Sequence, residues 1–351
     1  MTSPGETPPL AVKTEKRVAS TLRFDWIMIL LAFLSSLGGW LDSWAHQHIP
    51  QLETFFTPWH AVLYGSFLLE AAFLLGAVLY YHRKGYEWAL ALPRGYGLSL
   101  LGVVIFALSG VGDLIWHLLF GIERGVEALL SPTHLSLTLG DALIVTGPLR
   151  SAWYRSSREE LRGWQLVPML FSLSFLIGDM LFMTQFVNPF ILLIAAYRPA
   201  TDLDLVQSYG VASMLLFTAM LIGPTLFVLR RWQLPFGGLT LVFTYNTIAV
   251  CFMQDTYALI PAMIVAGLLA DTFLLFLKPT PGDPERVRIF AFLAPALILL
   301  LYFLNLQILT EVVWSVHLWM GSVVMAGLAG LLLSYLLLPL PISREQKVSE
   351  Q

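Results

Sequence analysis

Two stretches of the sequence carry the same ionisable side chains in the same order. The first, 41–65, reads LDSWAHQHIPQLETFFTPWHAVLYG, and the second, 112–140, reads GDLIWHLLFGIERGVEALLSPTHLSLTLG. Both contain Asp-x3-His, then a short loop, and then Glu-x3-(Ser/Thr)-Pro-x-His. Carboxylates and imidazoles grouped in this way are ligands for Zn, Fe, Mn or Cu. The repeat therefore predicts metal binding, either at one dinuclear centre or at two separate ions.

The predicted metal ligands are the Asp and the two His of each copy: Asp42, His46, His60, Asp113, His117 and His134. Asp-x3-His places both side chains on one helical face, one turn apart. In (Ser/Thr)-Pro-x-His, the hydroxyl residue suits the N-cap and Pro the first helical position, so the His falls in the first turn. The Glu of each copy, Glu53 or Glu127, is the predicted general base beside metal-bound water or dioxygen.

Three further residues are candidates for the same metal site. The sequence GDMLFM begins a fainter third copy of the motif, in which Asp179 takes the place of the Asp and Met183 that of the first His. A Met ligand would favour copper, because its thioether is soft. His317 lies near the start of the last apolar run. The metal stays open among Cu, Fe and Zn.

One copy of the motif resembles a known metal site. Asp42-x3-His46 followed by His60 on the next helix is similar to the Asp-x3-His…His pattern in the C subunit of copper membrane monooxygenases. The resemblance covers residues 42–60, and the spacing to the last His and the duplication depart from that family. It implies copper or oxygen chemistry. A bis-His haem held by His60 and His134 is a lesser alternative, because it leaves the carboxylates without a role.

A second set of acidic residues falls inside apolar runs: Glu70, Asp141, Asp179 and Asp271. Acids at membrane depth are protonated, hydrogen-bonded to neighbouring groups, or part of a proton or cation path. The sequence predicts Glu70, Asp141 and Asp271 as a proton path. The alternative is that each is a neutral carboxyl bonded to a neighbouring helix.

Helices that cross a membrane must position these side chains. The 351 residues are 57% hydrophobic and only 12% charged, whereas soluble domains carry roughly a quarter charged residues. Apolar runs of about 20 residues recur, the length that spans a bilayer as helix. We predict an all-α polytopic membrane protein of about ten helices in five hairpins, at 24–45, 58–81, 96–119, 131–149, 165–187, 206–229, 234–254, 257–277, 288–309 and 312–338.

The basic residues predict the orientation of these helices. Lys and Arg lie at the termini and in alternate loops, whereas the opposite loops hold only Arg124 and Arg198. By the positive-inside rule, both termini are cytoplasmic and the protein lies in a bacterial-type inner membrane. Asp42 is then about 27 Å, and Asp113 about 25 Å, from the cytoplasmic start of its helix. Both motifs therefore lie at the outer boundary of the membrane.

The predicted spans divide the chain into four parts. Residues 1–23 are a disordered cytoplasmic tail, 24–149 a duplicated two-hairpin module for the metal, 150–342 a six-helix membrane region and 343–351 a second cytoplasmic tail. The first two hairpins begin on the same side, so they form a parallel repeat. Cys251 is the single cysteine, which excludes an intrachain disulfide and a Cys-based zinc cluster.

Two functions fit these features. The first is a membrane-embedded metalloenzyme that oxidises or hydrolyses a lipid-like or small apolar substrate. The second is a proton- or metal-ion-linked transporter or metal-handling protein, with the buried acids as the route inward. Polar residues are scarce in the inner third of each span, which favours the static site of an enzyme. The expected partners are membrane lipid and the substrate, and no basic tract suggests nucleic acid.

Overall fold

A computed structural model describes residues 17–49, 56–123, 125–156, 160–197, 202–278 and 283–337, and every regular element in them is helical. The longer helices are α1 (Leu22–His48), α2 (Pro58–Arg83), α3 (Gly97–Phe120), α7 (Val167–Met183), α9 (Leu203–Leu229), α11 (Ile260–Leu277), α12 (Pro284–Leu309) and α13 (Val316–Leu337). The shorter ones are α4 (Val126–Leu130), α5 (Pro132–Val145), α6 (Gly147–Arg155), α8 (Pro189–Leu192) and α10 (Gly238–Phe252). Five single-turn 3₁₀ segments occur as well: η1 (Trp88–Leu90), η2 (Gly163–Leu166), η3 (Gln185–Val187), η4 (Ile194–Ala196) and η5 (Tyr257–Leu259).

Eight helical segments of the described residues are long and apolar enough to cross a membrane. The predicted class, an all-helical multi-pass membrane protein, is confirmed. The predicted count of ten spans is not confirmed. The segment predicted at 131–149 consists of α5 and α6, and the one predicted at 234–254 contains α10, which has 15 residues.

The break between α5 and α6 has a local cause. Pro148 follows Gly147 directly and lies in the first turn of α6, where its missing N–H needs no partner. Inside a continuous helix it would remove a hydrogen bond and clash with the preceding turn. Gly147 also packs closely on Tyr96, because an added Cβ would lie 2.5 Å from the tyrosine ring. The chain therefore restarts as α6, which ends beside the beginning of α1.

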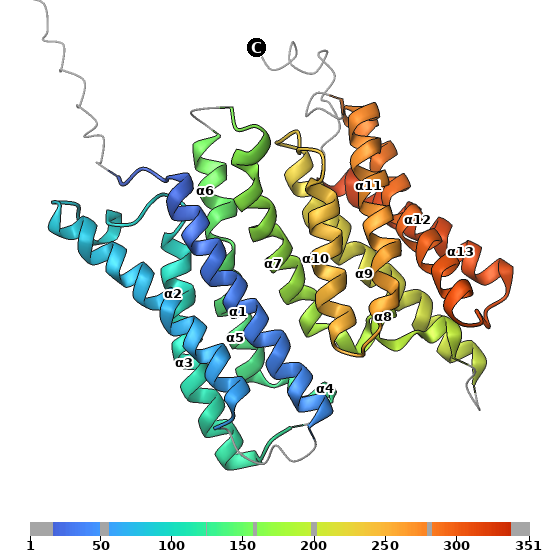
Figure 1. The fold of residues 1–351 in the computed structure, drawn as a ribbon, viewed down its shortest axis with the longest axis horizontal. Coiled ribbons are helices and arrows are strands. Elements are labelled where there is room, and N and C mark those ends of the chain that lie inside the picture. The colour runs from blue at the N-terminus through green and yellow to red at the C-terminus, as the bar shows by residue number, and fades with distance from the viewer. Residues whose placement is uncertain are drawn as a thin grey trace, which may run out of the picture.

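The buried apolar residues divide between two main clusters. One, which includes Met28, Leu74 and Phe106, lies among α1, α2, α3 and α5. The larger one extends from α6 through α13. In Figure 1, α7 lies between the two groups of helices, and it contacts α1, α5, α9 and α10. The domain boundaries predicted from the sequence stay predictions.

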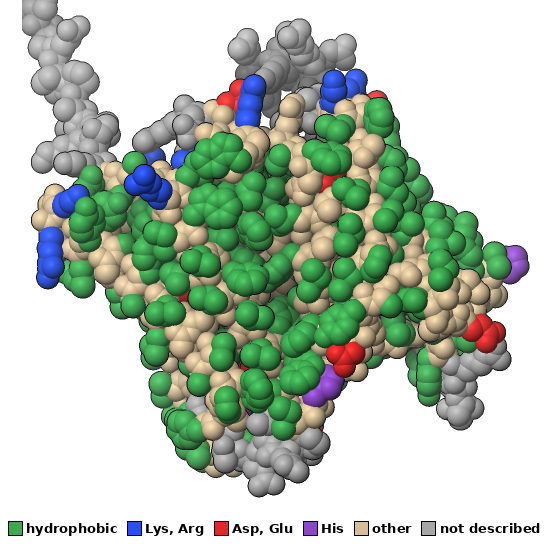
Figure 2. Space-filling view, in the orientation of Figure 1, with side chains coloured by type: hydrophobic (Ala, Val, Ile, Leu, Met, Phe, Trp, Pro, Cys, Tyr) green, Lys and Arg blue, Asp and Glu red, His purple; other side chains and the backbone are tan. Residues whose placement is uncertain are grey.

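Basic side chains gather at one end of the bundle. Figure 1 shows that α1 begins and α13 ends at this same end. Most of the visible Lys and Arg side chains lie along that edge in Figure 2. The helices leave apolar side chains such as Leu118, 76% exposed, on the outer surface. A lipid bilayer would cover such a surface.

Candidate metal centre

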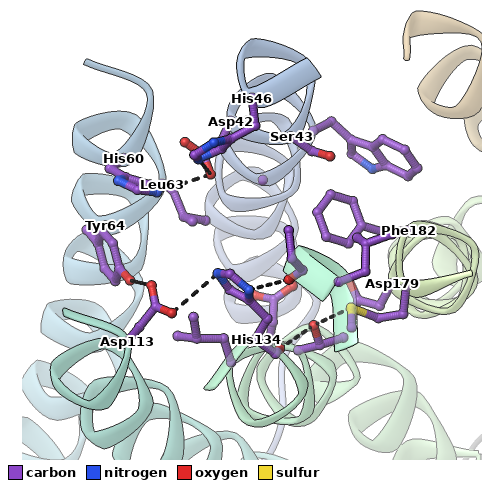
Figure 3. A pocket seen from close by; sticks show the side chains of 18 of the residues that line it. Asp42, Ser43, His46, His60, Leu63, Tyr64, Asp113, His134, Asp179 and Phe182 are labelled. Carbon is purple, nitrogen blue, oxygen red and sulfur yellow. Dashed lines mark hydrogen bonds and ion pairs between the residues drawn. The ribbon is translucent and has the colours of Figure 1, made fainter. Parts of the chain in front are cut away.

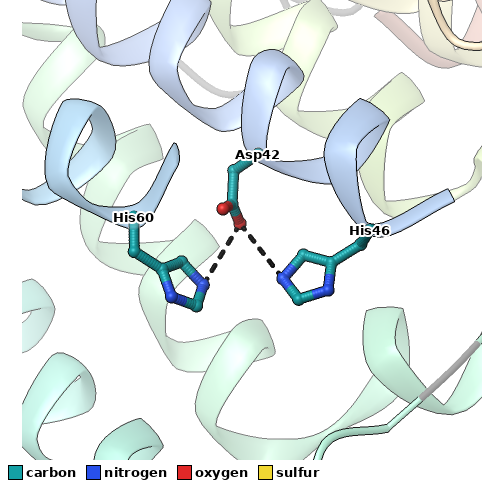
Figure 4. Close-up of side chains that lie close together, drawn as sticks. All are labelled: Asp42, His46 and His60. Atoms are coloured by element: carbon teal, nitrogen blue, oxygen red, sulfur yellow. Dashed lines mark ion pairs between the residues drawn. The ribbon is translucent and has the colours of Figure 1, made fainter. Parts of the chain in front are cut away.

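The first Asp/His/His group joins α1 to α2 (Figure 4). The Nε2 atoms of His46 and His60 lie 3.7 Å and 3.4 Å from Oδ2 of Asp42. Thr57 caps α2 by accepting a hydrogen bond from the backbone N–H of His60 at 3.1 Å. Gly38 lets the two helices approach, because an added Cβ would lie 2.9 Å from the Leu63 Cα. We call Asp42, His46 and His60 the first triad.

The second group joins α3 to α5 in the same way. The Nε2 atoms of His117 and His134 lie 3.5 Å and 3.3 Å from the carboxylate oxygens of Asp113. The cap repeats as well, since Ser131 accepts a hydrogen bond from the backbone N–H of His134 at 3.3 Å. Asp113, His117 and His134 form the second triad. The structure thus brings together each of the two predicted ligand sets.

The distances within each triad would allow its three side chains to bind one metal ion. A direct bond between a protonated His and a carboxylate would measure about 2.7–2.9 Å. Two N or O ligands of a tetrahedral ion, each about 2.0–2.2 Å from it, are roughly 3.3–3.6 Å apart. The Asp–His separations of 3.3–3.7 Å are longer than a direct bond and close to the spacing of metal ligands, and all three ligand atoms of each triad lie within 4.8 Å of one another.

The other ring nitrogens of the second triad have acceptors of their own. The Nδ1 atom of His117 is hydrogen-bonded to the Gly121 carbonyl at 3.3 Å, and Oε2 of Glu123 lies 3.1 Å from it without forming a hydrogen bond. The Nδ1 atom of His134 contacts the Ala128 carbonyl and lies 2.8 Å from Oγ of Ser131. These acceptors suit a protonated Nδ1, which leaves Nε2 as the ligand atom. Metal-binding histidines are usually held in this way by a carboxylate or carbonyl.

The first triad contains a buried oxygen with no hydrogen-bond partner in the described part of the chain. This atom is Oδ1 of Asp42. Leaving a charged oxygen buried without a partner costs free energy. Both histidines face the other oxygen, Oδ2, so a cation would satisfy Oδ1 if both carboxylate oxygens bound it. The donor set of one carboxylate and two imidazoles fits a transition metal.

Both triads line one cavity of about 140 Å³. Figure 3 shows the side chains of Asp42, His46, His60, Asp113 and His134 around this cavity. Tyr64 lies one turn after His60 on α2 and donates a hydrogen bond to Oδ2 of Asp113 at 3.4 Å. It thereby connects the two triads. Apolar residues form much of the remaining wall, among them Leu63, Phe106 and Phe182.

The same cavity extends to acidic residues deeper in the bundle. Asp141 and Asp179 line it and lie within hydrogen-bonding distance of each other. Met183 also lines the cavity, where its sulfur accepts a hydrogen bond from Thr138 at 3.0 Å. Glu70 is fully buried nearby, and neither of its oxygens has a hydrogen-bond partner among the described residues.

Several predicted site residues lie elsewhere. The carboxylate of Asp271 accepts hydrogen bonds from the first residues of α10, namely from Gly237 N, Leu239 N, Thr240 N and Thr240 Oγ1. This arrangement makes Asp271 a helix cap, so we leave it out of the proton path. His317 is exposed on α13, and Glu127 is exposed on α4; neither lines the cavity. Glu53 lies outside the described residues.

No protein-family model, curated protein or solved structure matches the chain. Its function is therefore inferred from the geometry of the cavity.

Proposed function

We propose that the protein is a membrane-embedded metalloenzyme that holds one transition-metal ion in each triad and acts on an apolar or lipid-like substrate. The observation that carries this proposal is the pair of matching triads in one cavity. Each triad offers three protein ligands, which leaves at least one coordination position for water, dioxygen or substrate. A bis-His haem is less well supported, because His60 and His134 each face the carboxylate of their own triad.

A metal in this cavity would supply Lewis acidity or redox chemistry for hydrolysis or oxidation. The ion could be Cu, Fe or Zn. The Gly121 carbonyl would hold the ring of His117 in position, with the carboxylate of Glu123 beside it. Asp141 and Asp179 would exchange protons with the reacting groups through the same cavity. The apolar walls at Leu63 and Phe106 suit an apolar substrate that enters from the bilayer.

Transport is the second candidate, and the extension of the cavity from the triads to Asp141 and Asp179 favours it. Beyond these acids, however, buried apolar residues such as Met28 and Leu74 fill the space between the helices. A path across the bundle would have to open through them. If proteoliposomes accumulate metal, and Asp141→Asn stops that accumulation, the transporter is the correct assignment.

Elemental analysis of the purified chain tests the metal sites. We expect two transition-metal ions per wild-type chain, one in His60→Ala, one in His134→Ala and none in the double variant, since each change removes one of three ligands. His82→Ala is the matched control, because this histidine lies at the far end of α2 and stacks on Trp88. Equal metal content in wild type and double variant would contradict the proposal.

We also propose that both termini are cytoplasmic and that the triads face the opposite side of an inner membrane. The gathering of Lys and Arg at one end of the bundle supports this orientation (Figure 2). A reporter protein that is active only in the cytoplasm should therefore be active when it is fused after residue 351. If instead a reporter that is active only outside the cytoplasm is active in this fusion, the proposed orientation is wrong.

A further inference from the structure

A basic pocket lies at the end of the bundle opposite the triads, where α1 and α3 begin and α6 ends. It consists of two cavities, of about 170 and 200 Å³, that share Arg17, Arg94 and Tyr154 as lining residues. Arg150 lines the first cavity, and Arg155 lines the second. Among the described residues, no Asp or Glu lines either one. Four arginines thus surround this pocket.

Hydrogen bonds hold the walls of the basic pocket in place. The guanidinium of Arg150 donates to the Gly95 carbonyl at 2.7 Å and to Oγ of Ser99 at 2.8 Å. Gly95 has φ +104°, and an added Cβ would lie 2.5 Å from the backbone N of Ser151. Only glycine fits this close contact. The segment that carries Arg94 is therefore fixed against α6 before any ligand binds.

Arg155 lines the second cavity and has two buried hydrogen-bond donors without a partner among the described residues. It is 9% exposed, and its Nη1 forms an ion pair with Asp25, which also accepts a hydrogen bond from Tyr96 at 2.7 Å. The Nε and Nη2 atoms of Arg155 have no hydrogen-bond partner within the described ranges. Asp25 forms an ion pair with one of the four arginines. A pocket lined by four arginines and, among the described residues, by no acidic side chain favours an anion.

We propose that the basic pocket binds a phosphate group, carried either by the headgroup of an anionic phospholipid or by free phosphate. Arginine is suited to phosphate because its planar N–H groups match the phosphate oxygens. Basic pockets between membrane helices on the cytoplasmic side commonly bind lipid headgroups. Leu98 lines the pocket and is 49% exposed on α3, where an acyl chain would lie against it.

Lipid retention by the full chain in neutral detergent tests the proposal. Native mass spectrometry with phosphatidylglycerol and phosphatidylcholine should show preferential retention of phosphatidylglycerol by the wild type. Arg17→Gln and Arg94→Gln should each weaken that retention about fivefold, as expected for the loss of one basic group near a lipid phosphate. Arg83→Gln is the matched control, since Arg83 ends α2 at the same end of the bundle and lines neither cavity.

A second measurement distinguishes the two sources of phosphate. The melting temperature is compared in inorganic phosphate and in chloride at equal ionic strength. Free phosphate is the ligand if phosphate raises the melting temperature, Arg94→Gln abolishes that rise, and the wild type shows no preference for phosphatidylglycerol. Equal retention of both lipids with no effect of phosphate would overturn the proposal. An equal loss in Arg83→Gln and Arg94→Gln would also overturn it, because the attraction would then be general surface charge.

Discussion

Removal of bound metal should lower the melting temperature of the wild-type chain in detergent. An ion that binds only the folded state stabilises it by about 4 kcal/mol at a thousandfold excess over its dissociation constant. Chelation removes that stabilisation and leaves Asp113, only 1% exposed, beside imidazoles that no cation holds together. The measurement is a thermal scan with and without chelator, paired with elemental analysis of each sample.

Substitutions of the triad histidines test whether the effect of chelator on the melting temperature comes from the triads. The double variant His60→Ala/His134→Ala should melt at the same temperature with and without chelator, and each single variant should keep part of the difference. His82→Ala should respond as the wild type does, because it leaves both triads intact. If the wild type contains no metal and chelator leaves its melting temperature unchanged, the triads are polar contacts between helix ends, and the metalloenzyme proposal fails.

The grouping of each triad follows from short-range patterns in the sequence. Asp42 and His46 are one turn apart on α1, and the Thr57 cap fixes His60 in the first turn of α2. Short loops bring the ends of consecutive helices together. For these reasons the sequence predicts which six side chains meet. Whether they bind metal stays a prediction.

The carboxylate beside His117 could not be chosen from the alignment of the two copies. That alignment selects Glu127, which is exposed on α4, whereas the structure places Glu123 against the imidazole. Gly121 is the signal that could have identified it. With φ +82° it ends α3 in a conformation that favours glycine, and Glu123, two residues later, lies beside the last helical turn.

The roles of the deeper acids depend on contacts between distant segments. Asp141 and Asp179 meet because α5 packs on α7, and the sequence alone gives no measure of that packing. Asp271 is buried, whereas Asp141 and Asp179 are partly accessible from the cavity; it faces the start of α10, where backbone N–H groups satisfy it. Hydropathy assigns these three residues to one class. Their hydrogen-bond partners distinguish the Asp141–Asp179 pair from Asp271, which caps a helix.

Loss of the buried ion pair between Asp25 and Arg155 should cause a second large effect. Asp25 is fully buried in the first turn of α1, and the Arg155 guanidinium is 9% exposed. Asp25→Ala would leave the guanidinium charge buried without its counter-ion. Breaking such a pair typically costs 3–5 kcal/mol. We therefore expect a clear fall in melting temperature, together with unfolding at a lower denaturant concentration.

Two further variants separate the charge from the packing. In Asp25→Leu/Arg155→Met both charges are replaced by apolar groups, and most of the lost stability should return, because no unpaired charge remains. Glu160→Ala breaks the exposed pair between Glu160 and Arg162, whose side chains are 74% and 76% exposed. That change should alter stability by less than about 1 kcal/mol. If Asp25→Ala is no more damaging than Glu160→Ala, water reaches Arg155.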